Sequence, residues 1–253
     1  MSIEEQARKV FGQRAAFYAT SPAHTDSQVL ARVVSLAATQ PDWLALDIAT
    51  GAGHTAFALA GHVRTVVGTD LTAEMLREAA LLRQERGAAN VAFALADVHH
   101  LPFSPGTFHL VTCRRAAHHF SGIGIALGEM YRILRLGGRV VIDDRSVPED
   151  DFVDACLNEL DRYHDESHVR QYRPSEWQQM MQGQGLTVES VEVYTKHRPL
   201  AAFTENASPE NVRNIHAAIA RLTSAQCEAL NLRNVKGEPH LNHWYVMLSA
   251  KKD

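Results

Sequence analysis

The apolar residues of this chain follow two different spacings along most of its length. Short apolar runs, typical of buried strands, lie near residues 43–48, 63–69, 91–96, 108–113 and 139–144. Segments with the helical spacing of apolar residues lie between them, near 54–61, 72–86 and 121–135. Strands that alternate with helices form parallel sheets with crossover helices on both faces. The pattern therefore predicts an α/β protein with a Rossmann-like, doubly wound sheet.

The two ends of the chain depart from this alternation. Helical patterns at 4–19 and 26–39 precede the first predicted strand. After residue 148 the predicted elements are helices at 149–166, 174–183 and 208–231, the last a pair, and strands at 186–194 and 244–250. These segments predict an added layer of helices beside the sheet.

The junction of the first predicted strand and the first predicted helix is the most informative stretch. An apolar run ends at Asp47, and the small residues Ala49, Gly51 and Gly53 follow before a helical pattern starts at Thr55. Small residues let a ligand approach the backbone, and the first amides of a helix are free to donate hydrogen bonds. In α/β proteins, this junction binds anionic or nucleotide ligands.

Two ligand classes fit this junction. Residues 51–56 satisfy the G-x-G-x-x-A form of the dinucleotide pattern, and Gly51 and Asp70 are 19 residues apart, near the roughly 20 expected for an acid that binds a ribose. Residues 47–53 resemble the D-x-G-x-G-x-G signature of class I methyltransferases that depend on S-adenosylmethionine (SAM), with Ala49 in place of the first glycine. Asp47 and a third strand-ending acid, Asp97, favour SAM.

Further segments carry the resemblance to a narrower group. Residues 97–111 are similar to the D-x-x-x-L-P-F-x-x-x-x-F-D-x-V passage of the ubiquinone/menaquinone-biosynthesis-like group, methyltransferase type 11, with His109 in place of the second acid. Residues 113–120 are similar to that group too, and residues 131–142 look like its helix, Gly-Gly turn and fifth strand. The resemblance covers residues 10–145 well and the C-terminal part loosely. It implies a seven-stranded, mostly parallel sheet whose last strand is inserted antiparallel.

The resemblance also implies a function and a division of the chain. We expect one SAM-dependent methyltransferase domain over 1–253, with an N-terminal helical lid (1–40), a cofactor-binding core (41–147), and substrate-covering helices with the last strands (148–253). The expected reaction is transfer of a methyl group from SAM to a C, O or N nucleophile of a small molecule. Two alternatives stay open: an NAD(P)-dependent oxidoreductase, and a SAM-binding protein of this fold that transfers no methyl group.

The expected cofactor site follows the carboxyl ends of the first strands. The resemblance implies Asp70 at the ribose, Asp97 at the adenine amino group and Asp47 beside the methionine amino group. Each acid could instead serve the fold, as a helix cap, a turn acid and a tie for the glycine loop, respectively. Similarly, Met75 could pack beneath its helix and Tyr18 in a seam between helices. The remaining expected cofactor-binding residues are Ala49, Gly51, Gly53, Leu71, Val98 and Arg114, together with Met75 and Tyr18.

Paired histidines offer candidate chemistry. His118 and His119 follow the fourth predicted strand, where the family places residues near the transferable methyl group, and histidine suits proton transfer at neutral pH. We expect His119 rather than His118 to be the base, although either could pack inward. We expect a solvated helix face at 164–168 and a loop at 240–243, so the histidines there predict no metal.

An acceptor pocket is expected over the carboxyl ends of the strands, at the switch point of the sheet. Residues 149–184 and 196–240 would roof it. Its expected wall residues are Arg114, Arg115, His168, Arg170, Tyr172, Arg173 and Trp177. The arginines suggest an acceptor with an anionic or carbonyl group.

Composition narrows the partners. The chain has 253 residues, of which 45% are hydrophobic, enough for one domain with a large core. A net charge of −4 and the lack of basic clusters with aromatics argue against nucleic-acid and anionic-membrane surfaces. Three scattered cysteines and the lack of a signal-like segment predict a cytoplasmic protein. A small-molecule acceptor is the expected partner, and a homodimer is compatible with the sequence.

Overall fold

The computed structural model describes residues 2–205 and 207–253. Position 1 of the expected segment 1–40 and position 206 of the expected segment 148–253 lie outside the described residues. The strands are β1 (Leu44–Ile48), β2 (Thr65–Asp70), β3 (Val91–Leu95), β4 (Phe108–Arg114), β5 (Leu134–Ser146), β6 (Leu186–Pro199), β7 (Arg233–Val235) and β8 (Glu238–Lys252). The helices are α1 (Ile3–Thr20), α2 (Ser27–Ala37), α3 (His54–Ala60), α4 (Ala73–Arg86), the 3-10 turn η1 (Ala117–His119), α5 (Ile123–Ile133), α6 (Asp151–His164), α7 (Pro174–Gly183), α8 (Ala201–Thr204), α9 (Pro209–Ala220) and α10 (Ser224–Ala229).

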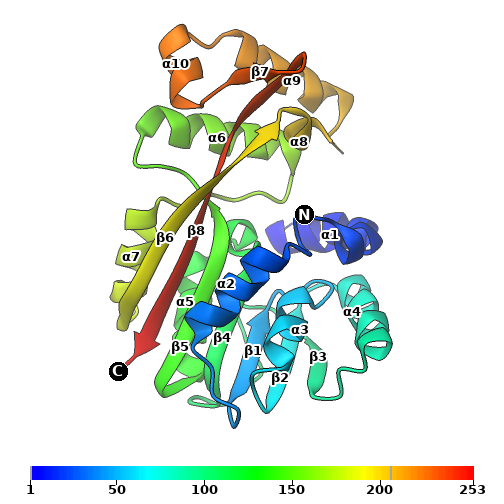
Figure 1. The fold of residues 1–253 in the computed structure, drawn as a ribbon, viewed down its shortest axis with the longest axis vertical. Helices are drawn as coiled ribbons and strands as arrows, with labels where there is room; N and C mark the ends of the chain where they lie inside the picture. Colours follow the sequence, from blue (N-terminus) through cyan, green and yellow to red (C-terminus); the bar gives the residue numbers. More distant parts are fainter. Residues whose placement is uncertain (1, 206) are drawn as a thin grey trace.

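One sheet joins all the strands. Its order is β3-β2-β1-β4-β5-β8-β6, and the short β7 pairs with β8 (Figure 1). The strands β1 to β5 pair in parallel, whereas β8 lies antiparallel between β5 and β6. This order confirms the predicted doubly wound sheet with an antiparallel last strand. The short β7 makes eight strands among the described residues, where seven were predicted. The strands β6 and β8 are longer than the sequence predicted and extend past the end of the parallel strands (Figure 1).

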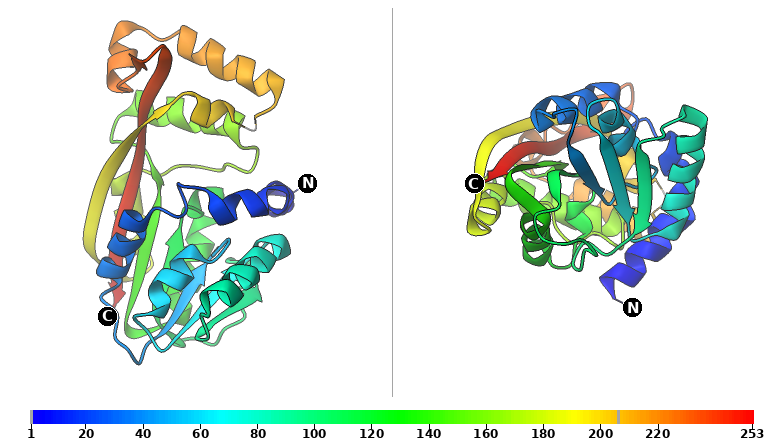
Figure 2. Two further views of the ribbon diagram at one scale, coloured as in Figure 1. Left: turned by 45° about the vertical axis from the view of Figure 1, so that its right-hand side comes forward. Right: turned by 90° about the horizontal axis from the view of Figure 1, so that it is seen from below.

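Alternating residues of the parallel strands build two cores. In β1, Leu46 and Ile48 face the layer of α5 and α7, and Ala45 faces the layer of α2 and α3. These helices lie on opposite sides of the sheet (Figure 1, Figure 2). The fully buried leucine and isoleucine side chains each contribute roughly 1.5–3 kcal/mol. Trp177 of α7 is fully buried in the first core, so its predicted place in a pocket wall is wrong.

A third core lies where β6 and β8 extend beyond the parallel strands. It packs α6, α8 and α9 around Leu157, Phe203 and Leu241. The helix α1 lies between this upper part and the parallel strands (Figure 1, Figure 2). Residues after 148 therefore contribute both to the sheet and to a separate helical layer. Within residues 2–205 and 207–253, no helix combines the length and apolarity needed to cross a membrane.

Candidate functional site

The loop between β1 and α3 has a left-handed backbone at three positions. The φ angles of Ala49, Gly51 and Gly53 are +50°, +55° and +87°. A Cβ atom at Gly51 would have no heavy atom within 4 Å, whereas one at Gly53 would lie 2.9 Å from the ring of Phe57. The backbone at Gly51 is therefore open to a ligand, and Gly53 allows the loop to pack closely against α3.

Ala49→Gly is expected to stabilise the protein. An L side chain in the left-handed region costs about 1–2 kcal/mol, and glycine avoids this cost. The greater freedom of glycine in the unfolded chain offsets about 0.5–1 kcal/mol. The free energy of unfolding should therefore rise by up to about 1.5 kcal/mol, and the Tm by up to about 3–6 °C, in differential scanning calorimetry. Ala58→Gly in α3 is the control and should lower the Tm; a lower Tm for Ala49→Gly as well would contradict the strain argument.

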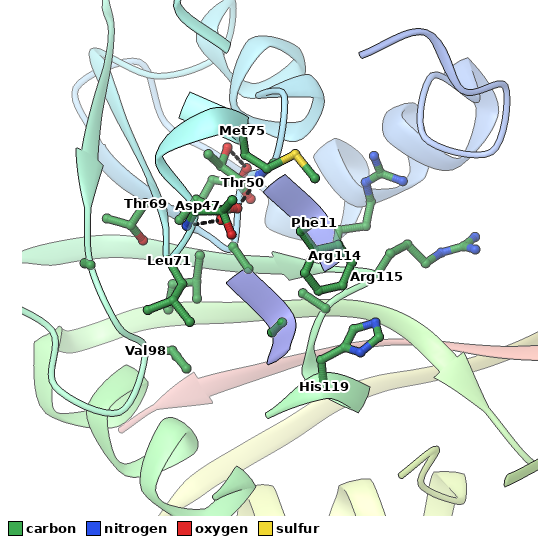
Figure 3. Close-up of a pocket in the computed structure, with 18 of the residues that line it drawn as sticks. Phe11, Asp47, Thr50, Thr69, Leu71, Met75, Val98, Arg114, Arg115 and His119 are labelled. Carbon is green, nitrogen blue, oxygen red and sulfur yellow. Dashed lines mark hydrogen bonds between the residues drawn. The ribbon is translucent and has the colours of Figure 1, made fainter. Parts of the chain in front are cut away.

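This loop forms one wall of a first cavity, which encloses about 1050 Å³ including its mouth. The cavity lies over the ends of β1 to β4 and is closed on another side by α1 (Figure 3). The eleven residues expected to bind the cofactor include ten that line it: Tyr18, Asp47, Ala49, Gly51, Asp70, Leu71, Met75, Asp97, Val98 and Arg114. Gly53 does not line it and supports the loop from behind.

Asp70 ends β2 and holds the glycine loop. Its Oδ2 accepts a hydrogen bond from the amide of Gly51 at 2.8 Å, and its Oδ1 accepts one from the amide of Thr72 at 2.9 Å. Burial raises the pKa of this carboxyl group above its ordinary value. Asp70 therefore lines the cavity, holds the glycine loop and anchors the start of α4.

Asp47 ties β1 to its neighbours. Its two oxygens accept hydrogen bonds from the hydroxyl groups of Thr50, at 2.6 Å, and Thr112, at 2.7 Å. The side chain is buried, and burial raises its pKa to about 6. Asp47 borders the cavity and ties down the glycine loop through Thr50, which is the structural role that the sequence left open.

Asp97, two residues after the end of β3, also lines the cavity. Its Oδ1 accepts a hydrogen bond from the amide of His99 at 2.9 Å and lies 2.7 Å from Nδ1 of the same residue. Apolar side chains of Leu71, Met75 and Val98 line the cavity beside it (Figure 3). A carboxylate next to apolar side chains suits an aromatic base that carries an amino group.

Arg114 ends β4 beside the glycine loop. Its Nε donates to the hydroxyl of Thr55 at 2.9 Å, and its Nη2 donates to the carbonyl of His24 at 2.7 Å. Its buried Nη1 has no hydrogen-bond partner among the described residues. Because Arg114 lines the cavity, this donor is available to an anionic group such as a carboxylate.

The helix α1 and the segment after it cover the first cavity. Tyr18 packs its ring against the rings of Phe11 and His24, with centroids 5.7 and 4.8 Å apart. Burial raises the pKa of Tyr18 to about 12, so its phenol is neutral. His54, at the start of α3, donates from Nε2 to the Tyr18 carbonyl at 3.2 Å. This bond joins the cover to the glycine loop.

A second cavity of about 950 Å³, including its mouth, lies between α1, the end of β5, α6 and the upper part of β6 and β8. Five residues line both cavities, namely Phe11, Tyr18, His24, Arg115 and His119. The two cavities therefore meet at these residues. The second cavity lies over the carboxyl ends of the central strands, as expected of an acceptor pocket.

The two adjacent histidines have different surroundings. His118 is buried, and its Nδ1 lies 2.6 Å from Oδ1 of Asp144. His119 is half-buried at the junction of the cavities. Its Nδ1 lies 3.1 Å from both the carbonyl and the hydroxyl of Ser167, and because that hydroxyl donates to Asp165, Nδ1 donates to the carbonyl. A carbonyl can only accept, so this bond leaves the Nε2 of neutral His119 with a free lone pair.

Several predicted wall residues lie elsewhere. The guanidinium groups of Arg170 and Arg173 bind Asp154 on α6, at 3.1 and 2.8 Å, so these arginines neutralise a carboxylate instead of facing the cavity. Tyr172 packs its ring against Trp177 in the first core. Of the predicted set, Arg114 lines the first cavity, His168 the second, and Arg115 both.

The predicted positions of the other histidines, on a solvated helix face and in a loop, are also wrong. His164 ends α6 and is half-buried, and His168 follows the helix and is buried, so neither lies on a solvated helix face. His240 and His243 lie on β8, and His243 stacks on Phe203 with centroids 4.6 Å apart. No cluster of the described residues has the side chains to hold a metal ion.

Sequence reasoning missed some lining residues. Arg145, near the end of β5, lines the second cavity. Asp144 beside it binds His118, and an acid near a strand end was the same signal that pointed to Asp47 and Asp70. Arg198 and Tyr245 come from β6 and β8 and carried no local signal. They reach the cavity only because β8 inserts between β5 and β6.

Comparison with known proteins adds independent findings. A family model described as a methyltransferase domain matches residues 46–142. The chain is 36% identical over 182 residues to the methyltransferase YcgJ of Bacillus subtilis, covering 72% of each chain. The YcgJ crystal structure superposes with a TM-score of 0.83 at 30% identity, over 88% of this chain and 97% of that one.

Two further proteins widen the comparison. The chain is 32% identical over 198 residues to the ubiquinone/menaquinone biosynthesis C-methyltransferase UbiE of Brucella canis, covering 73% of this chain and 69% of the relative. Geranyl diphosphate C-methyltransferase of Streptomyces coelicolor, solved with S-adenosylhomocysteine, has a TM-score of 0.62 at 14% identity, over 90% of this chain and 77% of that one. At that identity, the likeness concerns the fold.

Proposed function

The chain belongs to the class I SAM-dependent methyltransferases of the UbiE-like group, and from this premise we propose that its second cavity binds a small-molecule methyl acceptor. The protein is an enzyme that transfers a methyl group, and its cofactor is SAM. The dinucleotide alternative is thereby excluded. The observation that carries the proposal is the meeting of two cavities at His119.

The residues of the first cavity fit SAM. The open backbone at Gly51 leaves room for the ligand, and the unpartnered Nη1 of Arg114 offers a donor for the methionine carboxylate. We propose Asp70 for the ribose hydroxyls and Asp97 for the adenine amino group, next to Leu71, Met75 and Val98. Asp47 would act on the methionine end, while Ala49 and Gly53 shape the loop and Tyr18 covers the ligand.

His119 is proposed as the catalytic base. When bound, SAM supplies a methyl carbon that bonds to the acceptor as its bond to the positively charged sulfur breaks, the electron pair staying on sulfur. The free lone pair of His119 Nε2 takes the proton that the acceptor loses and later releases it to solvent. Phe11, whose ring centroid lies 4.9 Å from that of His119, excludes water on one side. Alignment and exclusion of water supply the rest of the catalysis.

Different segments of the chain have different proposed roles in this reaction. We propose that residues 1–40 form the lid, that 41–147 bind the cofactor, and that 148–253 cover the acceptor and complete the sheet. An acceptor that must enter a cavity beneath α1 is a small molecule rather than a nucleic acid, and the names of relatives such as UbiE support this. Three cysteines without a disulfide support a cytoplasmic location.

Transfer of a radiolabelled methyl group tests the acceptor class. The protein is incubated with SAM labelled on the methyl group and with separate pools of small metabolites, proteins and RNA from a bacterial lysate. We expect label to accumulate in the small-metabolite pool with wild type and not with His119→Ala. Label in the protein or RNA pool alone would contradict the proposal of a small-molecule acceptor.

A further inference from the structure

Four arginines line the second cavity, and three of them are ion-paired. Arg14 pairs with Asp165 at 3.7 Å, Arg115 with Asp143 at 3.0 Å, and Arg145 with Asp161 at 3.0 Å. Arg115 also binds the hydroxyl of Tyr194 and lies over the ring of Tyr245. These three guanidinium groups are thus already balanced by carboxylates of the protein.

Arg198 differs from the other three. It lies near the end of β6, is half-buried, and lines the cavity. Among the described residues, the ion pairs of this cavity are those of the other three arginines, and none includes Arg198. Glu205, which also lines the cavity, is exposed to solvent. Taking a guanidinium group partly out of water without a counter-charge has a cost that an anionic ligand would remove.

Four of the histidines that line the cavity, namely His24, His118, His164 and His168, add no positive charge at neutral pH. Burial lowers the pKa of His164 to about 4 and that of His168 to about 2. It also holds the pKa of His24 and His118 well below their ordinary value. These imidazoles are neutral and offer hydrogen bonds only, which leaves Arg198 as the cation of the cavity without a paired acid among the described residues.

The pKa of Tyr245 depends on the electrostatic potential near Arg198. Burial alone would raise the pKa of this phenol, but the guanidinium groups of Arg115, Arg145 and Arg198 outweigh burial and lower it. The positive potential at Tyr245 remains although Asp143, Asp161 and Asp165 are already paired with the other three arginines. A negative charge placed near Tyr245 would therefore be stabilised. Tyr245 itself, a buried side chain of β8, lines the cavity.

We propose that Arg198, together with the hydroxyl of Tyr245, binds a carboxylate group of the methyl acceptor. The guanidinium group of Arg198 forms a hydrogen bond with the side chain of Tyr245 and has no paired acid among the described residues. It therefore matches a single negative charge, and its planar fork fits the two oxygens of a carboxylate. A phosphate dianion would need a second free cation, which the ion pairs of the other arginines do not leave. The inference rests on the proposed function, because it assigns the second cavity to the acceptor.

Binding of paired probes tests this site without turnover. Protein saturated with S-adenosylhomocysteine is titrated calorimetrically with benzoate, 4-hydroxybenzoate, phenylacetate and hexanoate, and with the primary amide of each. The titrations are made at about pH 8, where Asp161, whose pKa burial raises to about 6, stays ionised and paired with Arg145. We expect at least one acid to bind about ten-fold to a hundred-fold more tightly than its amide.

Variants test whether Arg198 causes the preference for acids over amides. Arg198→Gln should abolish it, Arg198→Lys should retain part of it, and Glu205→Gln, the matched control in the same cavity, should keep or increase it. The proposal would be overturned if wild type bound acids and amides equally, or if a folded Arg198→Gln kept the preference for acids. It would also be overturned if phenyl phosphate bound more tightly than the acids, or if no acid showed saturable binding at millimolar concentration. Unchanged binding of S-adenosylhomocysteine by Arg198→Gln separates these outcomes from failure of the methyltransferase site.

Discussion

His119→Ala is expected to lower turnover by about 10²–10⁴-fold, the range that a positioned general base contributes. The affinity for SAM should change little, because His119 borders the first cavity only where it meets the second. Turnover is measured as formation of S-adenosylhomocysteine with an acceptor identified from the labelled pool, and SAM affinity by calorimetry. Added imidazole should restore part of the rate, since the alanine leaves space for it at the junction.

His118→Ala is the informative comparison. His118 is fixed by Asp144, so its removal leaves a buried carboxylate without that partner and should cost about 1–3 kcal/mol of stability. Its effect on turnover at a temperature well below the Tm should be much smaller than that of His119→Ala. Equal turnover in wild type and both variants would leave alignment as the whole mechanism, and lost SAM binding in His119→Ala would assign that histidine to the cofactor site.

The sheet and the glycine loop could be predicted because their signals are local. A buried parallel strand has to be an apolar run, and its end has to carry the residues that meet the ligand, so Asp47, Asp70 and Asp97 stand out in the sequence. Even Ala49, the departure from the family signature, keeps the left-handed backbone that glycine usually supplies. Local spacing therefore located the first cavity.

The second cavity could not be predicted in the same way. Its walls combine α1, β5, α6, β6 and β8, and which side chains meet depends on the insertion of β8 between β5 and β6. The sequence also does not show which carboxylate pairs with a given arginine. Arg170 and Arg173 looked like ligands but bind Asp154, whereas Arg198, without a sequence signal, lines the cavity.

The histidines illustrate a related limit. A pair four residues apart, His164 and His168, suggested an exposed helix face because two acids lie between them. The helix α6 ends at His164, and the chain then turns inward so that His168 Nε2 lies 3.0 Å from the amide oxygen of Asn158. Helical periodicity predicts a face only as long as the helix continues, and here no glycine or proline marked its end.

Asp70→Ala should weaken SAM binding by about ten-fold to a hundred-fold in calorimetry. The carboxylate is proposed to accept hydrogen bonds from the ribose hydroxyls, and a bond to a charged acceptor contributes about 1.5–3 kcal/mol. The same oxygens hold the amides of Gly51 and Thr72, so part of a loss in affinity could come from a loosened loop. A measurement on the single variant cannot separate the two contributions.

A double-mutant cycle with an altered ligand separates them. S-adenosylhomocysteine and its 2′-deoxy analogue are each titrated into wild type and Asp70→Ala. If Asp70 binds the ribose, deleting the 2′-hydroxyl should weaken binding to wild type but hardly affect the variant, because the interaction is already gone, and the coupling should lie within about 0.5–3 kcal/mol. If Asp70 only anchors the loop through Gly51 and caps α4 through Thr72, the two deletions should add within about 0.5 kcal/mol. Additive losses would therefore remove Asp70 from the ribose site even if its replacement lowers the affinity for SAM.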